Sequence, residues 1–244
     1  MRRNSLIANH VTAGKVSFGI NHKMVDFTHN RAKDLDLVIC RRGDPRTYTT
    51  SRKHTISNFH DMVAAYGIDL AAADAKDLAA IPPIPLTGVA SALVAMEAKA
   101  AFTEFGKARP RLYDELNSSH LTIHGDTDSA IAAAFVIINL SDSFISPLRA
   151  PWTLDATHPA PVNHHKQPKA TIDVIAKVDQ IPRRSAAGVP GYDAIGLAVI
   201  DCKNDGSPIT LVTSPPAPRV GDAFYYDSFL DRLETIYATR FAGI

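Results

Sequence analysis

The fold is decided by the stretch Asp34-Leu35-Asp36-Leu37-Val38-Ile39-Cys40, in which an acidic start gives way to a β-branched apolar run. A run of this kind predicts a central strand of a sheet that is covered on both faces. Before it, apolar residues alternate with polar ones across about 15–27, which predicts another strand. The segment 28–33 between them is polar and turn-like, so the two strands should form a hairpin.

A further strand is predicted for Leu93-Val94-Ala95-Met96-Glu97-Ala98-Lys99. In an extended chain Glu97 and Lys99 leave the sheet on the same face. If this strand lies beside that of Asp36, two carboxylates and one ammonium converge. Two carboxylates without a cation would raise each other's pKa, and a divalent ion such as Mg²⁺ resolves that conflict. A lysine beside the ion can orient or deprotonate water and stabilise charge on a phosphate, as metal-assisted phosphodiester hydrolysis requires.

At these residues the chain resembles the PD-(D/E)XK nuclease superfamily: Asp36-Leu37-Val38-Ile39 is followed by Glu97-Ala98-Lys99. The order of hairpin, aspartate strand, Glu-x-Lys strand, helix and strand is similar to the family core, although Leu35 stands where the family usually has proline. The resemblance implies an α/β fold with a restriction endonuclease-like mixed sheet flanked by helices. The core would span 1–145, with an inserted segment at about 41–87 between the active-site strands. Residues 146–244 would form a helical and β elaboration packed on the core, within one structural domain.

The same resemblance assigns roles to individual residues. Asp36, Glu97 and Lys99 would be catalytic. Asp36, Glu97 and the backbone carbonyl of Ala98 would bind Mg²⁺, with Mn²⁺ as a substitute, and Lys99 would position or activate the attacking water. Asp34 is a rival to Asp36, which we prefer because it directly abuts the apolar run.

The implied activity is Mg²⁺-dependent hydrolysis of DNA by a restriction-type endonuclease, or by a nuclease effector of an antiviral defence or mobile-element system. Cutting both strands with one site per chain would favour a homodimer or a partner subunit. The alternative is a catalytically silent module that keeps the fold and binds nucleic acid or a protein partner.

The most basic segment of the chain runs from Arg41 to His54 and contains a single acid, Asp44. We expect a loop that touches the phosphate backbone, which gives affinity without sequence readout. The candidates for nucleic-acid contact in this segment are Arg41, Arg42, Arg46, Arg52 and Lys53. The resemblance implies that the helix after Lys99 borders the active site, which adds Arg111 and Tyr113 as candidates. The alternatives are a solvated loop, solvated arginines and a core tyrosine.

Two other motifs are interpreted as structural. His124-Gly125-Asp126-Thr127-Asp128-Ser129 is similar to the metal-binding aspartate motif of family B DNA polymerases, but the chain is too short for the rest of a polymerase. We interpret it as a turn and helix cap, with a hydrolase that uses Asp126 and Asp128 as a third hypothesis. His164 and His165, with His158 nearby, lack the further ligands at the spacing of a zinc site.

The remaining elements follow from periodicity and proline placement. Helices are expected over 55–66, 69–78, 171–178 and 222–241, a strand over 192–202, and a helix broken or begun near Pro110. The run 132–140 fits a buried strand or a helix-to-strand segment. The proline density of 146–168 predicts an irregular excursion.

Composition limits the class of protein. With 244 residues, 45% hydrophobic and 21% charged, the chain is neither disordered nor collagen-like, and its net charge of +1 neither requires nor excludes nucleic acid. The longest apolar runs are too short to span a bilayer, and the first residues lack an apolar stretch of signal-peptide length. We therefore expect no membrane association and a cytoplasmic location. Cys40 and Cys202 lie in apolar runs and should be buried thiols.

Overall fold

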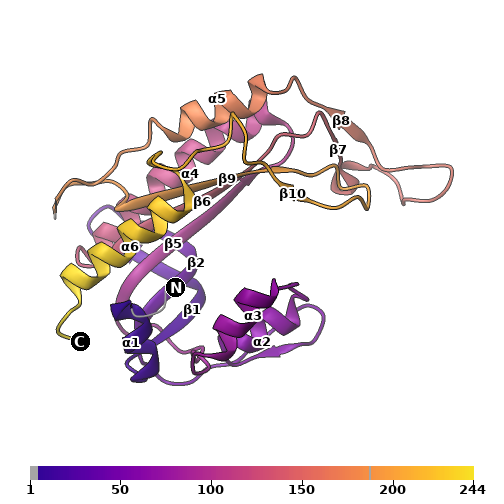
Figure 1. The fold of residues 1–244 in the computed structure, drawn as a ribbon. Helices are drawn as coiled ribbons and strands as arrows, with labels where there is room; N and C mark the ends of the chain where they lie inside the picture. Colours follow the sequence, from indigo (N-terminus) through magenta and orange to yellow (C-terminus); the bar gives the residue numbers. More distant parts are fainter. Residues whose placement is uncertain (1–4, 187) are drawn as a thin grey trace.

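The computed structural model describes residues 5–186 and 188–244 and has a six-stranded mixed sheet at its centre (Figure 1). In spatial order the strands are β1 (Val16–Asp26), β2 (Arg31–Arg41), β5 (Ala92–Ala101), β6 (Ile131–Asn139), β9 (Ala194–Asp201) and β10 (Thr210–Leu211). β5, β6 and β9 run parallel, whereas β1, β2 and β10 are antiparallel to their neighbours. The expected α/β class with a mixed sheet is confirmed.

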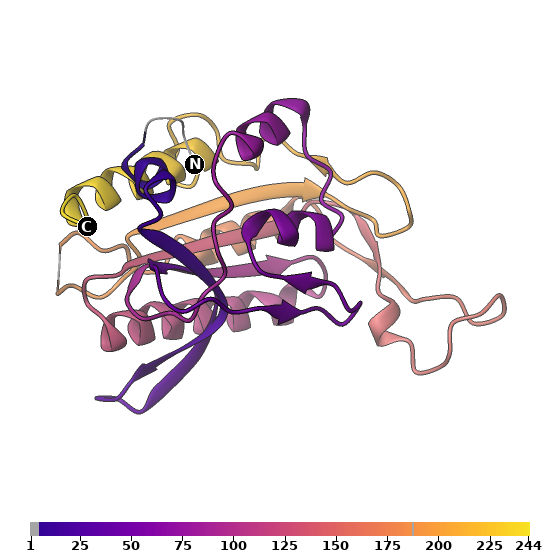
Figure 2. The ribbon, with the colours of Figure 1, turned by 90° about the horizontal axis from the view of Figure 1, so that it is seen from below.

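Helices cover both faces of the sheet, which is why its central strands are apolar on both sides. The long helix α4 (Phe105–Asp126) and α5 (Lys169–Val178) pack on one face, where Leu116 and Val174 are fully buried. The helices α1 (Leu6–Thr12) and α6 (Tyr226–Arg240) cover the other face. Figure 2 shows α4 on one side of the sheet and α1 and α6 on the opposite side.

The segment between β2 and β5 forms a separate layer at the β1 edge. It contains β3 (Tyr48–Thr49), β4 (Thr55–Ile56), α2 (Phe59–Ala65) and α3 (Ala72–Ala79). Its end runs beside β1, where Phe18 N donates to Pro85 O (3.1 Å) and Thr87 N donates to Phe18 O (2.9 Å). The segment therefore leaves the two strands adjacent and covers their outer neighbour.

The chain after residue 139 makes an excursion and then returns to the same sheet. β7 (Ser143–Ile145) and β8 (Val162–His164) form a short hairpin with the 3₁₀ turn η1 (Pro147–Arg149) between them. The irregular chain between η1 and β8 extends away from the sheet (Figure 2). β9 then pairs with β6, so residues beyond 145 contribute strands to the central sheet.

Several sequence expectations are confirmed, and several helix boundaries are corrected: the helix expected over 69–78 is α3 (Ala72–Ala79) and that expected over 222–241 is α6 (Tyr226–Arg240). Residues 131–139 form a strand, which settles the alternative left open for that run. The expectation of a helix broken or begun near Pro110 is wrong, because α4 begins at Phe105 and continues through this proline. Pro110 is exposed, so the carbonyl left without its helical N–H can bond to water. The helix expected from residue 55 begins at Phe59, because Thr55–Ile56 pair in β4 and Asn58 caps α2 through Asp61 N (2.9 Å).

Both cysteines, Cys40 and Cys202, are buried free thiols, as expected. Within the described ranges, no helix combines the length and the apolar character needed to cross a lipid bilayer.

Candidate active site

The antiparallel pairing of β2 with β5 brings Asp36 beside Glu97 and Ala98. Leu37 is the partner of Met96 in this register, and the backbone N–H of Ala98 donates to Asp36 Oδ2 at 2.7 Å. The strand of Asp36 and the strand of Glu97 are therefore neighbours, which the sequence argument required. Asp36 is exposed to solvent, whereas Glu97 is only 3% exposed. The cluster thus has an open side and a buried side.

Lys99 lies between two carboxylates on the face of the sheet that α4 covers. Its Nζ forms ion pairs with Glu97 Oε1 and with Glu115 Oε2, the latter at 3.3 Å. Glu115 belongs to α4, and its other oxygen accepts a hydrogen bond from Arg111 Nε at 2.6 Å. Four charged side chains from β5 and α4 therefore form one chain of contacts, with Asp36 next to it.

Glu115 was not identified from the sequence. The signal that could have found it is its spacing from Arg111, because residues four apart share one face of a helix. Such pairs are common on solvated helices, however, and only the packing of α4 on the sheet directs this one toward Lys99.

Burial and neighbouring charges set the protonation of the cluster. Burial raises the pKa of Glu97, Lys99 works against this shift, and the Asp36 carboxylate adds to it. Burial alone would lower the pKa of Lys99, but its hydrogen bonds and charge interactions with Glu97 and Glu115 outweigh burial and raise it. Burial would raise the pKa of Glu115, but Arg111 and Lys99 together lower it. Lys99 is therefore an ammonium at neutral pH and Glu115 a carboxylate.

The residues of this cluster fit a hard divalent cation. Glu97 Oε2 is buried and has no hydrogen-bond partner within the described residues. A buried carboxylate oxygen without a partner is costly, and a cation beside it would remove that cost. No group of three or more His, Cys, Asp and Glu side chains that could hold a metal occurs in the described parts of the chain. Mg²⁺ is commonly bound by only one or two carboxylates together with water and substrate phosphate. Asp36, Glu97 and the carbonyl of Ala98 are thus the residues that would hold it.

The basic candidates lie at different distances from this cluster. Arg41, Arg42, Arg46, Arg52 and Lys53 are all exposed. Arg41 ends β2, roughly 16 Å along the strand from Asp36 at about 3.3 Å per residue, so Arg41 does not belong to the cluster itself.

The two helical candidates differ from each other. Arg111 joins the cluster through Glu115, with 79% of its side chain exposed. Tyr113 is partly buried, and the Lys177 ammonium of α5 lies 4.0 Å from its ring centroid. Tyr113 therefore packs between α4 and α5, on a different side of α4 from Arg111.

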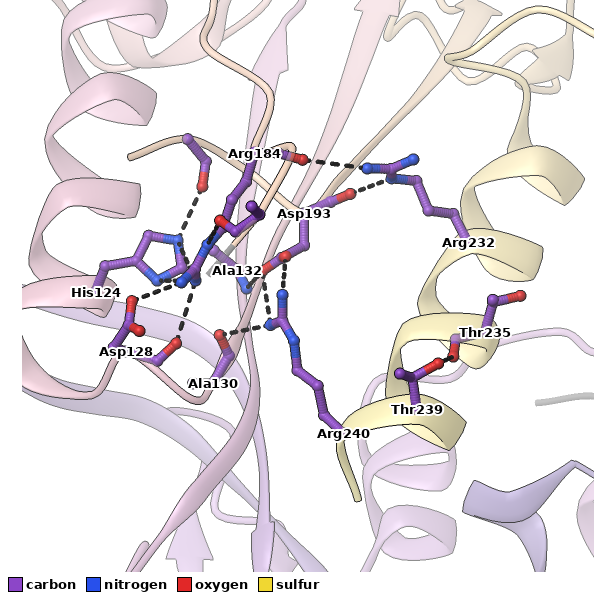
Figure 3. A network of polar contacts seen from close by, with 12 residues as sticks. His124, Asp128, Ala130, Ala132, Arg184, Asp193, Arg232, Thr235, Thr239 and Arg240 are labelled. Carbon is purple, nitrogen blue, oxygen red and sulfur yellow. Dashed lines mark hydrogen bonds and ion pairs between the residues drawn. The ribbon is translucent and has the colours of Figure 1, made fainter. Parts of the chain in front are cut away.

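The acidic pair at the C-terminal end of α4, Asp126 and Asp128, makes contacts that connect elements of the fold. Asp128 pairs with the buried Arg184 at 2.5 Å, and Asp126 Oδ2 accepts from Val25 N at 3.1 Å. Figure 3 shows Arg184 pointing toward both His124 and Asp128, with Asp193 and Arg240 close by. These contacts tie the end of α4 to the chain before β9 and to α6, as the interpretation of a structural turn predicts.

The histidines expected to be structural also have ordinary partners. His165 bonds to Ser141 O at 3.0 Å and to the Thr103 hydroxyl at 3.1 Å. His158 pairs with Asp155 in the excursion. In the described residues these rings therefore do not assemble around a common point.

In comparisons with known proteins, no family model matches the sequence, no curated protein matches it, and no solved structure matches the fold. The functional argument therefore depends on the site itself.

Proposed function

We propose that the chain is a metal-dependent deoxyribonuclease of the PD-(D/E)XK type, a restriction-type endonuclease or a nuclease effector of a defence or mobile-element system. The observation that carries the proposal is the juxtaposition of exposed Asp36, buried Glu97 with its unpartnered Oε2, and Lys99. Strands that lie far apart in sequence supply these groups, and their chemistry suits hydrolysis of a phosphodiester bond.

Each residue of the cluster has a separate role in the proposed reaction. Asp36 and Glu97, with the carbonyl of Ala98, would hold Mg²⁺ or Mn²⁺, and the ion would polarise the scissile phosphate and lower the pKa of a bound water. Lys99, held as an ammonium, would orient the attacking water and stabilise the negative charge that develops on the phosphate. Its raised pKa favours this electrostatic role over that of a general base while Glu97 and Glu115 both contact it.

The proposal is tested with the purified full chain, supercoiled plasmid and linear duplex DNA, with Mg²⁺ or with a chelator. We expect cleavage only with the metal. Asp36→Asn, Glu97→Gln and Lys99→Met should each slow it about a hundredfold or more, because each removes a charge that acts on the reacting phosphate.

Two other aspartates, Asp34 of β2 and Asp126 at the end of α4, provide matched controls. Asp34→Asn lies on the same strand as Asp36, and Asp126→Asn removes the acid of the third hypothesis. Both variants should cleave at the rate of the unmodified chain. Full activity in Lys99→Met, or loss of activity only in Asp126→Asn, would refute the assignment. Binding of DNA that needs no metal and never leads to cleavage would favour the catalytically silent module instead.

A further inference from the structure

Lys99 forms an ion pair with the Glu97 carboxylate, which the proposed site needs for binding the metal ion. Its ammonium pairs with Glu97 Oε1, while Glu97 Oε2 has no partner within the described residues. A divalent ion at Glu97 and an ammonium on the same carboxylate would repel each other strongly at this distance in a half-buried site. The lysine must therefore shift when the ion binds, and a shifted ammonium needs another anion.

Glu115 is placed to be that anion. Its Oε2 already lies 3.3 Å from Lys99 Nζ, and its Oε1 is held by Arg111 at 2.6 Å. The neighbouring residues Leu112 and Leu116 are buried against the sheet, so the packing of α4 fixes the position of Glu115. About a quarter of each side chain is exposed at Lys99 and Glu115, which leaves the lysine room to turn.

We propose that Glu115 is a positioning residue that provides Lys99 with a second anionic partner, so that Glu97 becomes free to bind the divalent ion. This inference rests on the proposed function and deepens it. Without Glu115, Lys99 remains paired with Glu97 and competes with the metal ion. Breaking that pair would leave a partly buried ammonium without an anionic partner, which is costly. With Glu115, the ammonium moves aside and remains next to the site.

The test measures Mn²⁺ binding by calorimetry on the full chain without DNA, in a double-mutant cycle of Glu115→Gln and Lys99→Met. We expect Glu115→Gln to weaken Mn²⁺ binding about tenfold or more in the unmodified background. In the Lys99→Met background no ammonium competes, so Glu115→Gln should change binding by less than about twofold.

The controls separate a positioning role from simple loss of negative charge. Asp114→Asn removes the same charge from an exposed neighbour on α4 and should leave Mn²⁺ binding unchanged. Should Glu115→Gln fail to fold, Glu115→Asp keeps the charge, shortens the reach and should also weaken binding. Equal weakening in both Lys99 backgrounds, or none in either, would overturn the positioning role.

Failure of the proposed function has a different result. If Mn²⁺ does not bind, or binds equally to Asp36→Asn, both proposals fall. If binding needs Asp36 but is insensitive to Glu115, the nuclease proposal stands and the positioning role alone is wrong.

Discussion

Two buried ionisable side chains on the α4 side of the sheet each have an unpartnered atom within the described residues, Glu97 Oε2 and His120 Nδ1. Their surroundings differ. The charge of the exposed Asp36 carboxylate acts on Glu97. His120 is 1% exposed, bonds through Nε2 to Asn117 at 3.0 Å and packs edge-on against the Tyr192 ring. Burial, with help from His124 and Arg31, lowers the pKa of His120 to about 4. We therefore expect His120 to act on stability, whereas Glu97 belongs to the proposed metal site.

The lowered pKa of His120 predicts a loss of stability in acid. Below its pKa of about 6.5, the His120 side chain of the unfolded chain binds a proton, whereas that of the folded chain stays neutral down to about pH 4. The free energy of unfolding is therefore highest above about pH 6.5 and falls as the pH is lowered to about 4. The effect should reach about 3 kcal/mol at 1.36 kcal/mol per pKa unit. Urea unfolding between pH 7 and 4 should show a shallower decline for His120→Leu than for the unmodified chain. Parallel curves for the two proteins would contradict the assignment.

At the level of elements, α6 is fastened to the start of β9 by ionic contacts (Figure 3). Arg240 pairs with the buried Asp193 at 2.5 Å, and Asp193 also accepts from Ala132 N at 2.9 Å. Arg232, about two turns earlier on α6, donates to the backbone carbonyl of Asp193. One buried carboxylate thus holds α6, β6 and β9 together.

Replacing Asp193 should therefore destabilise the protein without acting on the site. Asp193→Ala leaves Arg240 and Ala132 N without their partner, and we expect the free energy of unfolding to fall by roughly 3 kcal/mol. The matched control is Asp179→Ala, which removes the solvent-exposed pair with Arg183 and should cost less than about 1 kcal/mol. Equal losses in denaturant unfolding of the two variants would show that the buried pair does not fasten the helix.

The strands themselves could be predicted because their signals are local, whereas the adjacency of β2 and β5 entered the sequence argument only as a condition. The apolar run after Asp36 and the alternation around Glu97 identify β2 and β5 without tertiary information. The path of α4 through Pro110 could not be predicted, since it depends on that position facing solvent. Glu115 was missed for a similar reason: the sequence shows an ordinary helical pair with Arg111, and only the docking of α4 onto β5 brings it to Lys99.

At the scale of the whole molecule, each of the basic residues Arg42, Arg46, Arg52 and Lys53 between β2 and β4 is exposed to solvent. If this group grips the phosphate backbone, it contributes affinity that depends on salt and not on sequence. Arg52→Gln combined with Lys53→Gln should lower the slope of log affinity against log salt by about two. The measurement is fluorescence anisotropy of a duplex bound to the Lys99→Met protein, which should not cleave it.

The control for this surface is Lys76→Gln combined with Lys203→Gln. Both lysines are exposed and lie outside the basic segment, and the change in net charge is the same. The slope should remain unchanged in the control. A slope that falls equally in both double variants would mean that only net charge matters and that the segment is no dedicated contact.

The most direct test of the metal site is anomalous diffraction from crystals of the full chain grown or soaked with Mn²⁺. The account predicts one peak between Asp36 and Glu97, about 2.1–2.2 Å from a carboxylate oxygen of each, with Lys99 displaced toward Glu115. A peak elsewhere with Glu97 Oε2 still unliganded, or no peak while Lys99 remains on Glu97, would contradict it.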